Sequence, residues 1–422
     1  MNVRRTAGTL AALTAVLAGT AAPAAFAATA SPSPSPSAAL PSGLFGKTDP
    51  AYDGVWRQSL ALLAQHTVGL TPAAKAVDWL AGQQCADGAF PAYRAAPGTG
   101  TPCDAELPRD TNATAAAVQA LAAVGGHEAA TGRAVSWLKS VQNKDGGWPY
   151  APGGASDTNS TSVVVGALAA TGADPARVRA AKGTASPYTL LAEWSVPCAK
   201  DGGGALAYQP GKKGELAANA DATAAGVLAA LGKGFVTAAG KSSPGDGSCG
   251  GASPLTPADI ARNGAGYLRD RTSATGYLKS VLPGAGNQPD YGNTADAVVS
   301  LAALGWTGAA QKPYAWLEKH AAPWAGQSGP AAYAALILTA HAMGADPRHF
   351  GGTDLVQRLG ALGPAARQKA TGAQGTGAQG AERESAKQDG GGGLGVWWIV
   401  GIGLVAGAGI GFLLSGRGRR KP

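Results

Sequence analysis

The chain has 422 residues, of which 45% are hydrophobic and only 14% are charged, and its formal net charge at pH 7 is +8. Two positive charges stand in the first thirty residues and four in the last six, so about +2 is left for the region between them. A nucleic-acid-binding surface would need a basic patch in that region, and the sequence has none, so this class of function is excluded.

The chain begins with the features of a secretory signal peptide. Arg4 and Arg5 precede an apolar stretch, and Ala25 and Ala27 are the small residues of a cleavage site. We therefore expect residues 1–27 to be removed on export. No cysteine stands beside this site, which argues against a lipoprotein. The Pro/Ser-rich residues 28–44 that follow are expected to form an extended linker.

Between residues 45 and 362 the sequence predicts two kinds of helix in alternation. The first kind begins near an Asp, Asn or Thr, whose side chain can accept a hydrogen bond from a free backbone amide, and ends at a Gly. It has few polar residues beyond its first turn, so it should be buried nearly all round. Its copies are expected at 54–69, 109–126, 156–173, 217–232, 290–305 and 329–344.

The second kind of helix carries an aromatic residue followed by Leu and charged neighbours, which is typical of a helix with one exposed face. Its copies are expected at 73–84, 132–142, 187–195, 258–270, 312–320 and 353–363. Six buried and six amphipathic helices predict an all-α (α/α)6 toroid of six helical hairpins, with an inner ring covered by an outer ring. A five-hairpin barrel and an open solenoid are the alternatives.

The C-terminal part predicts a membrane anchor. Residues 363–393 are polar and Gly-rich and are expected to form a disordered stalk. Residues 394–415 are almost wholly apolar and long enough to cross the roughly 30 Å hydrocarbon core as a helix, although a buried core helix is the alternative. The basic tail, 416–422, should be cytoplasmic, which places the domain outside a cell membrane that the chain crosses once.

Four cysteines lie in the exported part, which is an even number in an oxidising compartment and therefore indicates disulfides. Three pairings are open. Cys85 with Cys103 and Cys198 with Cys249 are favoured, because each pair would close one Gly-rich connection. A zinc site is the competing interpretation, but no CxxC or CxxH spacing supports it.

A repeated motif follows two of the amphipathic helices. Residues 142–148 read Q-x-x-x-G-x-W and residues 84–90 read Q-x-x-x-G-x-F, while a third copy keeps Asp201 and Gly202. In this motif the chain resembles the prenyltransferase and squalene-cyclase repeat superfamily, whose members are α/α toroids. The resemblance implies that the Gln caps helix ends and that the aromatic residue stacks between layers. The motif itself then carries no chemistry.

The catalytic signatures of that superfamily are missing. Squalene-type cyclases use a D-x-D-D acid, which does not occur here. Protein prenyltransferases hold zinc with an Asp, a Cys two residues later and a distant His, and Asp246 with Cys249 has the wrong spacing. We therefore assign no catalytic residue and no metal ligand, although catalysis by an unrecognised set of carboxylates stays open.

The Asp-Thr starts at Asp110 and Asp157 resemble a third branch of the fold, the secreted cobalamin-carrier proteins. That resemblance implies a bulky ligand, with a corrinoid as one candidate, and no required cofactor. The carriers close over their ligand with a β-rich domain, which this sequence lacks. A β-rich partner protein or a transporter is therefore expected as a partner.

Parallel inner helices would gather their starts at one mouth, where free amides and partial positive charge suit polar ligand groups. Capping of the helix itself and packing between layers are the alternatives for each member. The expected ligand-binding residues are the polar start residues and the nearby aromatics Asp110, Asn112, Thr114, Asp157, Asn159, Thr161, Asn219, Asp221, Asp290, Thr294, Asp296, Trp148, Tyr150, Tyr208 and Tyr291.

The sequence thus favours a membrane-anchored extracellular protein that binds a bulky ligand without catalysis. The first alternative is an exported enzyme of the same superfamily that acts on isoprenoid or glycan substrates. The second is a structural cell-surface module whose axis is filled with alanine.

Overall fold

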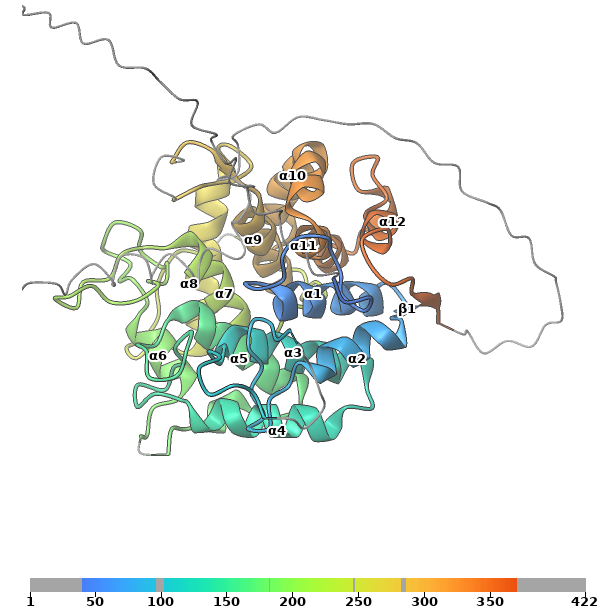
Figure 1. Ribbon diagram of the computed structural model, residues 1–422. Helices are drawn as coiled ribbons and strands as arrows, with labels where there is room; N and C mark the ends of the chain where they lie inside the picture. The colour runs from blue at the N-terminus through green and yellow to red at the C-terminus, as the bar shows by residue number, and fades with distance from the viewer. Residues whose placement is uncertain (1–39, 96–101, 182, 246, 282–285, 370–422) are drawn as a thin grey trace, which may run out of the picture. The chain divides into compact units, whose positions relative to one another are not determined.

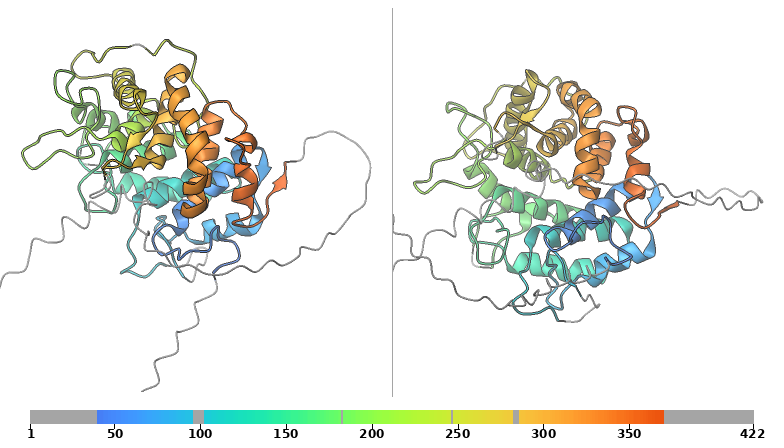
Figure 2. Two further views of the ribbon diagram at one scale, coloured as in Figure 1. Left: turned by 90° about the horizontal axis from the view of Figure 1, so that it is seen from above. Right: turned by 45° about the horizontal axis from the view of Figure 1, so that its top comes forward.

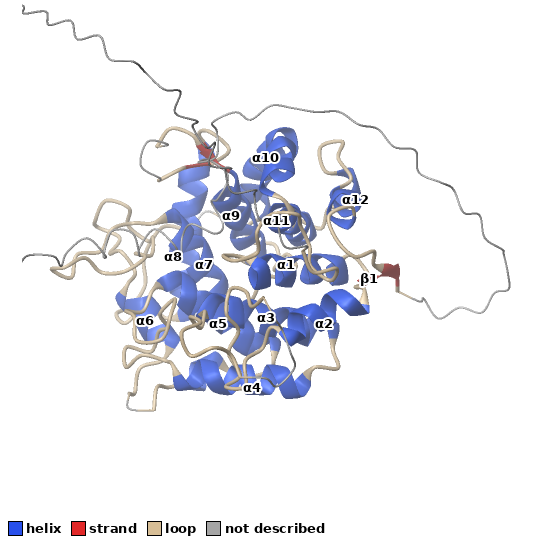
Figure 3. Ribbon diagram, in the orientation of Figure 1, coloured by secondary structure: helices blue, strands red, loops and turns tan. Residues whose placement is uncertain are grey.

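A computed structural model describes residues 40–95, 102–181, 183–245, 247–281 and 286–369. These residues contain twelve α-helices and four strands of two residues each (Figure 3). The odd-numbered helices are α1 (Gly54–Thr67), α3 (Thr111–Val124), α5 (Thr158–Ala170), α7 (Ala220–Ala230), α9 (Tyr291–Ala303) and α11 (Pro330–Ala342). The even-numbered helices are α2 (Ala74–Gly82), α4 (Glu128–Ser140), α6 (Pro187–Glu193), α8 (Pro257–Ser273), α10 (Thr307–Ser328) and α12 (Leu355–Gly360).

The odd-numbered helices form a closed inner ring (Figures 1 and 2). Each packs against the next one along the chain, and α11 packs against α1. Each even-numbered helix packs against the inner helix that precedes it, so it lies outside the ring. The contact between α11 and α1 distinguishes this arrangement from an open solenoid, and the six hairpins distinguish it from a five-hairpin barrel.

Small residues allow the inner helices to approach closely. In α3, every residue from Thr111 to Leu121 is buried, and Ala accounts for five of these eleven positions. Gly226 of α7 lies so near the preceding connection that an added Cβ would be 3.0 Å from a methyl carbon of Leu206. A helix without a polar face can bury its whole circumference only when other helices surround it, as they do here.

Two outer helices extend beyond the predicted ranges. Helix α10 begins before residue 312 and ends after residue 320, and it continues through Pro313 and Pro323. Proline removes one backbone hydrogen bond from a helix. The segments around both prolines contain several alanines, whose strong helix propensity favours continuation of the helix. Helix α8 likewise continues to Ser273.

The domain is wider than residues 45–362, which corrects the predicted linker and stalk boundaries. The Phe45 amide donates to Gln58 Oε1 at 2.8 Å, Gln58 Nε2 donates to the Gly43 carbonyl at 2.9 Å, and Phe45 is fully buried. Residues 43 and 44 therefore pack on the domain instead of continuing the linker. After α12, strand β4 (Arg367–Gln368) pairs antiparallel with β1 (Leu70–Thr71). Both additions lie where the sixth hairpin meets the first.

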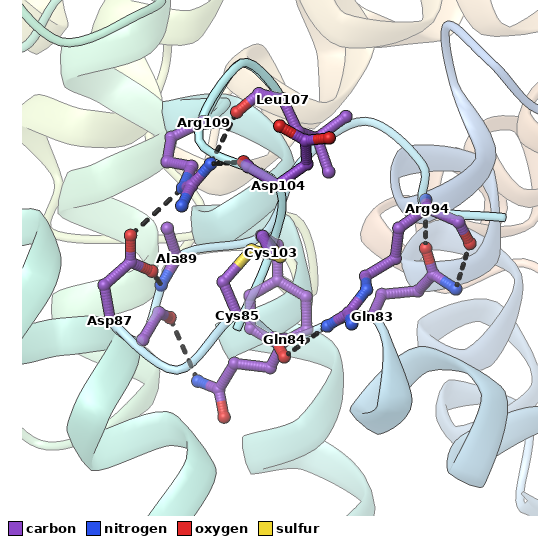
Figure 4. The surroundings of a disulfide bond; sticks show 12 residues. Gln83, Gln84, Cys85, Asp87, Ala89, Arg94, Cys103, Asp104, Leu107 and Arg109 are labelled. Carbon is purple, nitrogen blue, oxygen red and sulfur yellow. Dashed lines mark hydrogen bonds and ion pairs between the residues drawn. A yellow bond between two sulfur atoms is a disulfide. The ribbon is translucent and has the colours of Figure 1, made fainter. Parts of the chain in front are cut away.

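The structure holds the disulfides Cys85–Cys103 and Cys198–Cys249, which are the two pairs that the sequence favours. The first closes the long connection between α2 and α3 (Figure 4). Around it, Arg109 Nε lies 3.0 Å from Asp87 Oδ2, so an ion pair ties the two ends of the same connection together. The second disulfide joins the connection after α6 to the segment before α8.

Several predicted segments lie outside the described residues. These are the signal peptide, linker residues 28–39, stalk residues 370–393, the membrane helix at 394–415 and the tail at 416–422. Among the helices that the structure does describe, none combines the length and the apolar composition that crossing a membrane requires.

The Q-x-x-x-G-x-W motif has a structural role: its Trp is buried, as the resemblance implies, whereas its Gln closes a turn and does not cap a helix end. Gln142 Nε2 donates to the Gly146 carbonyl at 2.7 Å, which closes the turn after α4. Trp148 is fully buried between the layers and donates from Nε1 to the Leu138 carbonyl at 2.6 Å. Gly146 has a φ of +89°, and an added Cβ there would lie 2.3 Å from the carbonyl oxygen of Ser186, at the start of the next outer helix.

The close approach at Gly146 leads to a prediction about stability. We expect Gly146→Ala to lower the free energy of unfolding by about 3–4 kcal/mol, because a left-handed φ and a steric clash act together. Gly153→Ala is the matched control: Gly153 has a φ of +82° but no described atom within 4 Å of an added Cβ. It should cost about 1 kcal/mol. Urea denaturation measures both, and equal losses would contradict the proposed contact.

Candidate functional site

Four inner helices begin with the same cap. The N-cap side chain of each accepts a hydrogen bond from the backbone amide three residues later, at 2.6–3.0 Å. The residues are Asp110 of α3, Asp157 of α5, Asn219 of α7 and Asp290 of α9. Each of them satisfies an amide that would otherwise lack a partner inside the helix. These four predicted ligand-binding residues therefore cap the N-termini of their own helices.

A threonine stands four residues after each of these caps. Its hydroxyl oxygen accepts a hydrogen bond from a backbone amide of the preceding connection, at 2.9–3.0 Å. The pairs are Phe90 to Thr114, Trp148 to Thr161, Leu206 to Thr223 and Leu278 to Thr294. The predicted site residues Thr114, Thr161 and Thr294 thus attach each inner helix to the connection before it. Thr223 belongs to the same set, although the sequence pattern does not select it.

The inner ring encloses a cavity of about 110 Å³. A volume of about 10–15 Å³ in the same measure holds one water molecule, so the cavity has room for several waters or for a small organic molecule. Its lining residues come from all six inner helices and from one loop: Trp56, Leu60, Asn112, Asn159, Val163, Asp221, Ala225, Leu228, Phe235, Asp296, Val299, Ala335 and Leu338.

Polar and apolar lining residues occupy different levels of the cavity. Asn112, Asn159 and Asp221 each stand two residues after an N-cap, near the mouth, and Asp296 stands one turn deeper in α9. The remaining lining residues are apolar, and most of them belong to the middle of their helices. A molecule in this cavity would place an apolar part deep and a polar part toward the mouth.

Two aromatic side chains that the sequence pattern misses also line the cavity. The rings of Trp56 and Phe235 meet edge to face, with centroids 5.4 Å apart. Phe235 lies in the loop after α7, and its amide donates to Gln119 Oε1 of α3 at 2.9 Å. That bond brings a loop residue into the ring of helices. A loop residue outside any repeat carries no periodic signal, so the sequence pattern could not identify it.

Several polar atoms of the cavity wall have no hydrogen-bond partner among the described residues. They are Asn112 Oδ1, Asn159 Oδ1 and Trp56 Nε1. Asn112 is only 8% exposed, yet its side chain lines the cavity. Asn159 uses its other atom, since Nδ2 donates to Asp221 Oδ2 at 2.7 Å. Buried polar atoms without partners cost free energy, so a molecule that pairs with them would be stabilised here.

The two carboxyl groups of the cavity resist ionisation. Burial first, and then the charges of Asp290 and Asp157, raise the pKa of Asp221 to about 6, against the hydrogen bond from Asn159, which lowers it. Burial also raises the pKa of Asp296 well above its ordinary value, and the charges of Asp221 and Asp290 add to this effect. Because each ionised carboxylate disfavours the next, the pair favours a state with one proton and one negative charge.

The predicted aromatic site residues lie outside the lining of the cavity. Trp148 is fully buried between the layers. The Tyr150 hydroxyl is hydrogen-bonded to Asp110. Burial is the main cause that raises the pKa of Tyr150, and the charge of Asp110 adds to it. The backbone carbonyl of Tyr208 accepts from the Thr158 amide at 3.0 Å. Tyr291 stacks on Trp324 with centroids 5.5 Å apart. Of the predicted set, the structure brings Asn112, Asn159, Asp221 and Asp296 together on the cavity wall.

Metal binding has no visible basis in the part of the chain that the structure describes. Nowhere in it do three or more His, Cys, Asp or Glu side chains gather as metal ligands would.

Comparisons with known proteins give only distant likenesses. No family model matches the chain, and no curated protein matches it. Among solved structures, an ent-copalyl diphosphate synthase from Streptomyces platensis is 18% identical over 69% of this chain, with a TM-score of 0.45, and the match spans half of the synthase. A sugar epimerase from a ruminal bacterium is 13% identical over 66% of this chain and 81% of its own, with a TM-score of 0.43.

A protein from Actinoplanes is 16% identical over 68% of this chain and 99% of its own, with a TM-score of 0.31. None of these likenesses bears on the activity of the present chain.

The raised pKa of Asp221 predicts a stability effect. The folded-state pKa of about 6 exceeds the ordinary value of 3.8, so the folded state loses stability as pH rises through 6. Asp221→Asn removes the charge, and it should raise the free energy of unfolding by up to about 3 kcal/mol at pH 7.5 and by little at pH 4. Denaturation at both pH values measures the difference.

The matched control for this prediction is Asp78→Asn, because Asp78 is exposed on the outer helix α2. That variant should show no difference from the wild type at either pH. A loss of stability in Asp221→Asn at pH 7.5 would contradict the assignment of Asp221 as a costly buried charge.

Proposed function

We propose that the protein is an exported binding protein that captures a small amphipathic molecule in the cavity on the axis of its helical ring. The signal sequence and the two disulfides support export, since disulfides persist in oxidising compartments. The cavity supports binding, because a concave, mostly apolar space with a few convergent polar groups is the usual form of a small-molecule site.

The observation that carries this proposal is the unpaired Oδ1 atom of Asn112, buried on the wall of the same cavity that Asp221 and Asp296 line. In a purely structural module, this level of the ring could be filled with alanine, like the rest of the inner helices. Buried amides and carboxyls instead destabilise the folded state unless a molecule in the cavity, water or a ligand, pairs with them. This argues against the structural-module alternative.

The size of the cavity changes the class of ligand that we propose. About 110 Å³ is too small to enclose a corrin macrocycle, so the described residues do not fit a corrinoid. A smaller molecule fits. We propose further that residues 394–415, outside the described residues, anchor the chain in the membrane once, and that the ligand passes from the mouth to a partner such as a transporter.

A cavity-filling variant tests the proposal. Compounds that bind in the cavity at 100 times their Kd should raise the melting temperature of the wild type by roughly 5 °C. Ala225→Leu places three extra carbons in the cavity, so these shifts should vanish. The matched variant Ala315→Leu, on the exposed face of α10, should keep them. A small-molecule library screened by thermal shift measures all three proteins.

If the compounds stabilise the Ala225→Leu variant as much as the wild type, they bind elsewhere and the proposal is wrong. If no compound in a broad metabolite library stabilises the wild type, capture of a small molecule is also contradicted.

One observation favours a second candidate, an exported enzyme that acts on an isoprenoid or glycan substrate. Burial and the charges of Asp221 and Asp290 raise the pKa of Asp296 well above its ordinary value, in a mostly apolar cavity. A carboxylic acid that keeps its proton near neutral pH can act as a general acid. In this candidate, Asp296 donates its proton to the hydroxyl or glycosidic oxygen of the substrate, and the C–O bond breaks with release of water or of the leaving alcohol. The negative charge of Asp221 then stabilises the carbocation that forms.

The second candidate makes its own prediction. Asp296→Asn should abolish turnover of a short isoprenoid alcohol, with a loss of at least about 10²-fold, because the amide cannot donate the proton of an acid. Binding of the substrate should stay within about threefold. The control Asp110→Asn keeps an N-cap acceptor outside the cavity and should keep the activity. Mass spectrometry of the products measures turnover, and unchanged activity in Asp296→Asn would eliminate this candidate.

A further inference from the structure

The geometry points to a primary alkylammonium ion as the ligand of the cavity, with its ammonium group between the carboxyls of Asp221 and Asp296 and its apolar part against Trp56 and Phe235. This inference rests on the proposed capture function and specifies its ligand. It follows from the charge of the wall, from the unpaired atoms and from the aromatic pair, which are independent observations.

The charge of the wall is uniformly acidic. Two of the lining residues are aspartates, and no described lining residue is Lys, Arg or His. Two more carboxyls, those of Asp157 and Asp290, are close enough to raise the pKa of Asp221 by their charge. A negatively charged ligand would be repelled by this set, whereas a monocation would neutralise the one charge that the Asp221–Asp296 pair retains.

The unpaired atoms near the mouth require hydrogen-bond donors. Asn112 Oδ1 and Asn159 Oδ1 are hydrogen-bond acceptors, and neither receives a hydrogen bond from the described residues. The Asp221 carboxylate receives one hydrogen bond, from Asn159, and can accept more. A primary ammonium group offers three N–H donors from one small centre, which suits a cavity wall that presents several acceptors without donors. A quaternary ammonium ion would leave all of them unpaired.

The aromatic pair suits the rest of such a ligand. The face of an indole ring attracts a nearby cation, and the edge-to-face arrangement of Trp56 and Phe235 offers apolar surface beside it. The side chains of Leu60, Val163 and Leu228 add further apolar surface to the cavity wall. The Trp56 Nε1 donor has no described partner either, so an amine that also carries a hydroxyl oxygen would satisfy it.

The acidic surroundings give binding a direction with pH. Every charge neighbour that raises the pKa of Asp221 or Asp296 is itself a carboxyl, and beyond this pair these are Asp157 of α5 and Asp290 of α9. Tyr208, in the connection before α7, is neutral, since burial and the charges of Asp157 and Asp221 raise its pKa. Because Asp221 has a pKa of about 6, affinity for a cation should fall roughly tenfold between pH 7.5 and pH 5.

Three molecules of one shape test the inference with the full-length chain. 2-Phenylethylamine carries a positive charge, 2-phenylethanol is neutral and 3-phenylpropionate is negative. Calorimetry at pH 7.5 should give an affinity for the amine at least tenfold higher than for the alcohol, with no saturable binding of the carboxylate. Asp221→Asn should lower the affinity for the amine at least tenfold and leave that for the alcohol within threefold. Asp78→Asn should change neither.

The outcomes separate the two proposals. If the alcohol binds as tightly as the amine, or if Asp221→Asn leaves the amine unaffected, the ammonium inference is overturned while capture in the cavity stands. If neither molecule binds but the metabolite library yields compounds that Ala225→Leu no longer binds, the ammonium inference is again overturned and capture again stands. If no compound binds at all, both proposals fail. Asp221→Asn is expected to be at least as stable as the wild type, so a loss of binding cannot be ascribed to unfolding.

Discussion

The hydrogen bond between a connection and the threonine one turn into the following inner helix is the constraint on which the rest of the structure depends. It recurs at Thr114, Thr161, Thr223 and Thr294 with nearly the same length. Each bond fixes the start of an inner helix relative to the turn before it. Because the bond repeats, positions counted from the cap reach equal heights in neighbouring helices. That is how side chains two residues after three different caps meet on one wall of the cavity.

The sequence pattern identifies most of the fold. All twelve helices are predicted in order, since Ala-rich inner helices and amphipathic outer helices differ in composition along their whole length. The errors fall where local preference and context disagree, as in α10, which continues through Pro313 and Pro323. The pattern assigns residues 43–44 to the linker because a short Gly-Leu pair after Pro and Ser carries no periodic signal, although it packs against the domain.

The candidate site is predictable only in part. The start residues are visible as a set, but capping and ligand contact use the same residue types, so the sequence could not separate Asp110 from Asn112. Asp110, at the N-cap, accepts a hydrogen bond from the backbone of its own helix. Asn112, two residues further along, lines the cavity on the axis. Trp56 and Phe235 join the site through the contact of a divergent helix with a loop. No repeat in the sequence encodes that contact.

The pairing of β1 with β4 has a geometric consequence for how the domain is displayed. Strand β1 follows the end of α1, and the Lys369 amide donates to the Gly69 carbonyl at 3.2 Å beside it. The described chain therefore finishes at the face where inner helices end, whereas Asn112, Asn159 and Asp221 stand near the face where they begin. The last described residue and the polar residues of the cavity wall therefore stand at opposite poles of the ring, so a molecule bound at one pole would not contact the β1–β4 pair at the other.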